Sequence, residues 1–171
     1  MTTTSLNYDS GTDTNALTIT LASLPTSATL VVGRQTTVVD NTGDLYTDVI
    51  INGQITTGTS PTVDTVVELW VYSSLKMVSG AETYHSDFGA ADAGVTIASV
   101  QEKLALTRLH SFRVSATSNA SYAIQNLSIA EACGQVPTFW GILVTHSTAV
   151  NLNATAGNHW LHYTGIKYTD A

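Results

Sequence analysis

Charged side chains are scarce in this sequence. Asp, Glu, Lys and Arg make up 11% of its 171 residues, well below the share of about a quarter that is usual in soluble domains. A free monomer relies on surface charge to stay apart from its neighbours, so the shortage indicates a surface that is partly covered in an assembly. Thr, Ser, Asn and Gly fill the gap, and the β-branched Thr favours strands.

Basic residues are rarer than acidic residues. Six Lys and Arg face thirteen Asp and Glu, which gives a net charge of −7. The basic residues are scattered, apart from a loose group at 103–113. This group could form a basic stripe, but ordinary strand surface is the simpler interpretation. Because phosphate recognition needs clustered cations, we expect no nucleic-acid partner.

Cysteine and long apolar runs are also nearly absent. Cys133 is the only cysteine, which excludes an intrachain disulfide and a multi-cysteine metal site, and we expect it to be a small buried hydrophobe. No apolar run follows a basic start, and none approaches the roughly 18 residues of a membrane span. We therefore expect a protein without a membrane partner, made in a cytoplasm and soluble there until it assembles.

What the sequence does have is an alternation of apolar and polar residues with period two. Residues 1–15 are polar and aperiodic, which predicts a flexible N-terminal arm. Residues 16–171 are long enough for one domain. Within them the alternation and the turn residues predict about eight strands, in the segments 16–22, 30–39, 45–52, 63–72, 104–114, 122–129, 139–146 and 159–168.

Three segments fit this pattern less well. Residues 73–94 form the longest irregular stretch, which predicts a functional or mobile loop. Residues 95–103 fit either a short helix or the start of a strand, and residues 130–134 fit one helical turn ended by Gly134. Helical periodicity is otherwise almost missing, so the sequence predicts an all-β protein, a jelly-roll-like antiparallel β-sandwich.

The sequence offers little catalytic chemistry. It contains no nucleophile elbow, phosphate-binding loop or zinc-protease motif. Asp48 and Glu68 are a conceivable carboxylate pair on adjacent strands, but both lie opposite the main apolar rows, and exposure to solvent is the simpler interpretation. We therefore predict a protein that is not an enzyme and has no cofactor.

The histidines and tryptophans each allow two interpretations. His159 and His162 are three residues apart, which places them on opposite faces of one strand, so we predict no metal site. His146 and His159 are more simply core or interface residues, although one His on a three-fold axis would give a three-His cluster. Trp70, Trp140 and Trp160 fit either a sugar-binding platform or, more simply, core and interface packing.

Several runs of the chain resemble one group of viral proteins. They lie at 30–35, 40–42, 55–62, 68–72, 136–146 and 150–159, as in the run Val136-Pro137-Thr138-Phe139-Trp140-Gly141. Together they span residues 16–168 and are similar to small structural proteins of tailed bacteriophages. Residues 73–93 fit this pattern least.

The resemblance implies a virion component, most simply a jelly-roll head decoration (cement) protein. Such a protein would lie on the capsid surface as a homotrimer and bind the major capsid protein or other virion proteins. The alternative is a tail or baseplate module that recognises a host glycan. We predict that the contacts with partners include the loop residues Tyr84, His85, Asp87 and Phe88, together with the two histidines His146 and His159.

Overall fold

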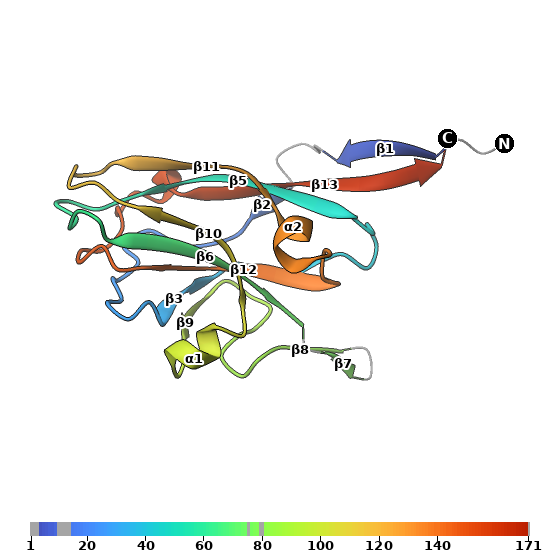
Figure 1. Cartoon of the computed structure of the whole chain (residues 1–171), viewed down its shortest axis with the longest axis horizontal. Coiled ribbons are helices and arrows are strands. Elements are labelled where there is room, and N and C mark those ends of the chain that lie inside the picture. The colour runs from blue at the N-terminus through green and yellow to red at the C-terminus, as the bar shows by residue number, and fades with distance from the viewer. Residues whose placement is uncertain (1–3, 10–14, 75, 79–80, 171) are drawn as a thin grey trace.

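The computed structural model describes residues 4–9, 15–74, 76–78 and 81–170. Two antiparallel sheets pack face to face (Figure 1). The first sheet has the strand order β1-β13-β5-β11, with β2 also paired to β13, and the second has the order β10-β6-β12-β3-β9, with β4 paired to β12. The prediction of an all-β sandwich is therefore confirmed.

The strands of the first sheet are β1 (Thr4–Asp9), β2 (Ala16–Leu17), β5 (Asp48–Thr56), β11 (Ser121–Ser128) and β13 (Trp160–Asp170). Those of the second sheet are β3 (Val32–Gln35), β4 (Val39–Asp40), β6 (Val66–Ser73), β9 (Ala93–Thr96), β10 (Thr107–Arg113) and β12 (Phe139–His146). A hairpin of β7 (Lys76–Val78) and β8 (Ala81–Thr83) stands apart from both sheets. The short helices are α1 (Val100–Lys103), α2 (Ile129–Cys133) and the 3₁₀ turn η2 (Ala156–Asn158).

The connections between the strands are those of a jelly roll. Eight strands make up the two central layers, namely β2, β3, β5, β6, β10, β11, β12 and β13. Numbered one to eight along the chain, they have the order 1-8-3-6 in the first sheet and 2-7-4-5 in the second. This interleaving, in which successive strands mostly change sheet, is the double Greek key of a jelly roll.

The main core lies between the two sheets, where period-two alternation directs the apolar side chains. From the first sheet it receives residues such as Val49, Ile51 and Leu161, and from the second Leu69 and Ile142, all buried. Two glycines permit the close approach of aromatic rings. A Cβ at Gly165 would overlap the ring of Tyr46, and one at Gly141 would overlap the ring of Tyr72.

Several elements differ from the sequence predictions. The strand expected at 16–22 is only the two residues of β2, and Leu45, expected in a strand, lies before β5 in a left-handed conformation and is exposed. Residues 4–9, expected within a flexible arm, instead form β1, which pairs with the C-terminal half of β13. The remaining arm residues 1–3 and 10–14 lie outside the described residues, whereas Asn15 is described and bonds to β1. The helical turn expected at 130–134 is present as α2. Within 95–103 the structure has both the end of the strand β9, at residues 95–96, and the helix α1 at Val100–Lys103.

The strands β1 and β13 form a two-stranded ribbon that projects beyond the rest of the sandwich (Figure 1). We call residues 4–9 and 165–170 the ribbon. No helix in the described part of the chain is both long enough and apolar enough to cross a membrane.

Candidate functional site

The outer face of the second sheet is covered by the chain segment between β8 and β10. Trp70 and Leu143 of the sheet pack against Val95 and Ile97 of this segment and form a second, smaller core. β6 is therefore buried on both faces, although its clean alternation predicts one face in solvent. This cover explains why Glu68, expected to be exposed, is buried.

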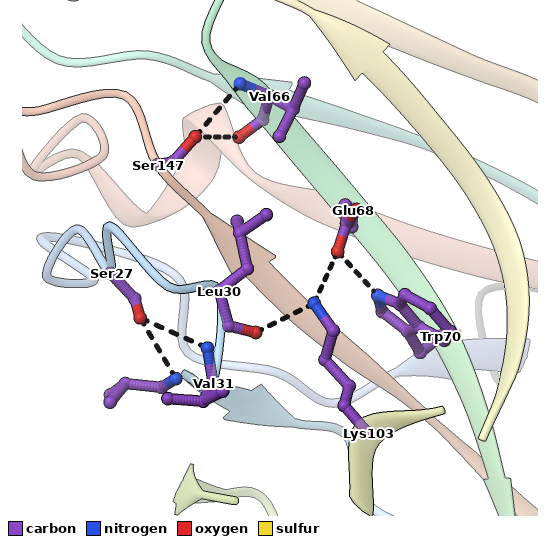
Figure 2. A network of polar contacts seen from close by, with 9 residues as sticks. Ser27, Leu30, Val31, Val66, Glu68, Trp70, Lys103 and Ser147 are labelled. Carbon is purple, nitrogen blue, oxygen red and sulfur yellow. Dashed lines mark hydrogen bonds and ion pairs between the residues drawn. The ribbon is translucent and has the colours of Figure 1, made fainter. Parts of the chain in front are cut away.

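A buried ion pair fixes α1 over the sheet. Lys103 Nζ lies 2.6 Å from Glu68 Oε2 and donates a further hydrogen bond, of 2.9 Å, to the carbonyl oxygen of Leu30 (Figure 2). Trp70 Nε1 donates to the same Glu68 oxygen at 3.0 Å, and Lys103 Nζ lies 4.8 Å from the centre of the Trp70 ring. Two buried charges are tolerated here because each has a partner of opposite sign and further polar contacts.

The loop that precedes α1 is held by a second set of polar contacts. The buried Gln35 side chain donates to the carbonyl oxygens of Gly89 and Ala91, at 2.7 and 2.6 Å, and accepts from the Gly89 N–H. Asp92 accepts from Arg34 Nε at 2.6 Å, and this guanidinium lowers the pKa of Asp92 against the opposing effect of burial. The loop is thus anchored to β3 along its length.

Between this loop, α1 and α2 lies a cleft of about 400 Å³. Its walls combine apolar and polar side chains, and they include Tyr72, His85, Phe88, Glu102, Leu106, Cys133, Gln135 and Pro137. Burial raises the pKa of the Cys133 thiol, so the neutral form is favoured. Mixed walls of this kind suit a small polar ligand with one apolar face.

The structure brings together the four loop residues predicted as contacts. Phe88 stacks on Tyr72 with ring centres 4.7 Å apart, and Tyr84 meets the same Tyr72 edge-on at 6.1 Å. His85 Nδ1 lies 3.5 Å from Asp87 Oδ2. The two aromatic rings thus serve internal packing, which leaves His85 and Asp87 as the chemically distinctive pair.

The other two predicted contact residues are not at the surface. His146 is fully buried, with Nδ1 2.9 Å from Thr148 Oγ1 and Nε2 3.0 Å from the Leu24 carbonyl oxygen. His159 is also buried, and its Nε2 lies 2.8 Å from the Asn153 carbonyl oxygen. Both rings therefore make their hydrogen bonds inside the subunit, and a contact of either ring with a partner stays a prediction.

Acidic and histidine side chains come close enough to hold a metal ion at one place in the described part of the chain. The potential ligand atoms of His85, Asp87 and Glu102 all lie within 4.8 Å of one another. This group was not predictable from the sequence, because Glu102 follows Asp87 by fifteen residues and its helix was only one of two alternatives. Asp48 and Glu68 do not form a pair, since β5 and β6 belong to different sheets.

The outer face of the first sheet is open and carries apolar side chains. On the ribbon, Leu6 lies directly opposite Tyr168, and Tyr8 lies opposite Ile166. Leu6, Tyr8 and Tyr168 are 50%, 60% and 63% exposed. Further along β13 the same face carries Trp160, which is 42% exposed and meets His162 edge-on. We call Leu6, Tyr8, Trp160, Ile166 and Tyr168 the apolar outer face.

The three tryptophans therefore have different roles. Trp140 is fully buried in the main core and Trp70 is buried under α1, as the simpler interpretation predicted. Trp160 alone belongs to the apolar outer face.

No family model, curated protein or solved structure matches the chain.

Proposed function

We propose that the chain is a structural protein of a tailed-bacteriophage virion, a head decoration protein that acts by binding other copies of itself and neighbouring shell proteins. The resemblance of residues 16–168 to such proteins supports this proposal, and so does the jelly-roll order of the strands. The observation that carries it is the apolar outer face, because several large apolar side chains exposed on one face mark a site of protein interaction.

The composition of this face suits a contact between copies of the chain. None of the outward-facing side chains of β13 from Trp160 to Tyr168 is charged, and neither is Leu6 or Tyr8 of β1. Interface centres are depleted in charge and enriched in aromatic residues, as this face is. Each copy carries a net charge of −7, so an uncharged face is where two copies approach with the least repulsion.

The edge of the ribbon adds to the same proposal. β1 is the last strand of its sheet in the described part of the chain. Its sequence, TSLNYD, has no Lys or Pro, the residues that commonly protect an edge from pairing with another chain. We propose that the occupant of the apolar outer face is a second copy, and that three copies form the trimer that the resemblance implies.

Light scattering on the purified protein tests the self-association. We expect the mass of a trimer for the unmodified chain and of a monomer for Leu6→Glu, because the new carboxylate would be buried without a partner. Val63→Glu is the matched control, since Val63 is similarly exposed but lies in the loop before β6. A monomeric unmodified protein, or equal masses for both variants, would refute the proposed interface.

The cleft favours a second candidate, a receptor-binding module for a host glycan. Its walls include the polar groups of His85 and Gln135 together with the aromatic Phe88, whose ring lies 6.4 Å from that of His85, which is a composition that sugar sites use. A glycan array separates the two candidates. Saturable binding of one glycan class that is lost in Gln135→Ala would support the receptor-binding role over decoration.

A further inference from the structure

Three side chains beside the cleft have the arrangement of metal ligands. His85 Nδ1 and Asp87 Oδ2 are 3.5 Å apart, and a carboxylate oxygen of Glu102 completes a group within 4.8 Å. Zinc binds nitrogen and carboxylate oxygen at about 2.0–2.2 Å in tetrahedral geometry, which separates two ligands by roughly 3.4 Å. We propose that His85, Asp87 and Glu102 bind a divalent transition-metal ion, most favourably Zn²⁺.

The environment of the Asp87 carboxylate is a second observation that supports a bound cation. Asp87 Oδ2 is inaccessible to solvent, and no donor in the described part of the chain makes a hydrogen bond to it. A buried carboxylate oxygen that accepts no hydrogen bond is destabilising. Its nearest basic neighbour, His85 at 3.5 Å, is too distant for a good hydrogen bond, whereas a metal ion between the two atoms would satisfy both.

The elements that carry the three ligands are fixed by their own contacts. Phe88 N–H donates to the His85 carbonyl oxygen at 2.9 Å, which closes a tight turn around Asp87. The loop after this turn is anchored by Gln35, and α1 is anchored by Lys103. Ser99 caps the start of α1, and its hydroxyl accepts a hydrogen bond from the Glu102 N–H. The site therefore needs little ordering when an ion binds.

The ligand types indicate which ions would bind. One imidazole nitrogen and two carboxylates suit Zn²⁺ or Mn²⁺, whereas Ca²⁺ prefers six to eight oxygen ligands. His85 and Glu102 also line the cleft, so the ion would lie in its wall with at least one position open to water or to a ligand in the cleft. This inference does not depend on the apolar outer face.

Isothermal titration calorimetry of the chelator-treated full chain with Zn²⁺ tests the site. We expect one ion per chain, and affinity lower by at least about tenfold in His85→Ala, Asp87→Asn and Glu102→Gln. Glu102 is exposed on a short helix, so Glu102→Gln remains a folded test even where another variant fails to fold.

Two control variants each remove a carboxylate or an imidazole that lies outside the proposed metal site. Asp44→Asn removes an exposed carboxylate near the ribbon, and His162→Ala removes a histidine of β13. Both variants should bind Zn²⁺ as the unmodified protein does. Co²⁺ gives a second readout, a visible absorption spectrum that should disappear in His85→Ala. An unmodified protein that takes up no Zn²⁺, or a Glu102→Gln variant that binds it with unchanged affinity, would overturn the proposal and leave a simple His85–Asp87 ion pair.

Discussion

At the scale of single residues, the least expected feature is the buried charge of Glu68 and Lys103. Sequence alternation places Glu68 on the polar face of its strand, and nothing local to β6 shows that another segment covers that face. The partner, Lys103, is thirty-five residues away and belongs to a helix of four residues. Such long-range burial cannot be read from period-two alternation, because the alternation reports only which face is more apolar.

This ion pair leads to a stability prediction. Lys103→Met keeps the bulk of the side chain but leaves Glu68 buried without its cation, so we expect the free energy of unfolding to fall by about 3–5 kcal/mol. Urea denaturation measures the change. Adding Glu68→Gln should recover part of the loss, and a loss below about 1 kcal/mol for Lys103→Met alone would show that the pair is not effectively buried.

The buried histidines predict a pH dependence of stability. Burial lowers the pKa of both His146 and His159, so the folded state keeps these rings neutral where the unfolded chain, with a histidine pKa of about 6.5, takes up protons. The unfolded state then binds more protons, and stability is lost as the pH falls below about 6.5. Denaturation at pH 7.5 and 5.5 should show this loss.

His146→Gln should reduce the slope of stability against pH, whatever it does to stability itself. Ile142→Val is the control, because it removes a buried methyl group from the same strand and should lower stability equally at both pH values. Equal slopes for the unmodified protein and His146→Gln would mean that His146 does not contribute to the pH dependence.

At the scale of elements, the long strands were predictable and the short ones were not. β5, β6, β12 and β13 lie within or close to the segments that alternation marked, because each has one face in the main core. β2 is shorter than expected, since Thr18 to Leu21 leave the sheet after two paired residues. β1 escaped prediction because only two apolar residues, Leu6 and Tyr8, alternate in it and neither is buried.

One side chain links β1 to the body of the sandwich. Tyr46 O–H donates to Asp9 Oδ2 at 2.7 Å, and the Tyr46 ring lies over Gly165 of β13. Burial, followed by this hydrogen bond, raises the pKa of Tyr46, so the hydroxyl stays protonated as a donor. The contact ties the position of β1 to the core of the first sheet.

Tyr46→Phe should therefore loosen β1 without unfolding the protein. We expect a loss of about 1 kcal/mol or somewhat more from the missing hydrogen bond to a charged group, concentrated in the ribbon. Hydrogen exchange should become faster for the β1 and β13 amides of the ribbon and stay unchanged in β12. Uniformly faster exchange, or none, would contradict this role for Tyr46.

At the scale of the whole molecule, the sandwich could be predicted from the sequence but the candidate site could not. The number of strands and the turns between them favour two sheets, and the jelly-roll order followed only as an expectation from chain length. The loop residues His85 and Asp87 were singled out because long loops often carry function. Glu102 was missed, since it reaches them only through the tertiary position of α1.

The central claim is that this chain is an assembly protein of a phage head, and one measurement tests it most directly. Heads of the phage that encodes the chain under this proposal, prepared without the protein, would be mixed with the purified chain, and bound protein would be quantified against added protein. The account predicts saturable binding at a fixed number of copies per head, weakened by Leu6→Glu and unchanged by Val63→Glu. No binding to such heads by a correctly folded chain would contradict it.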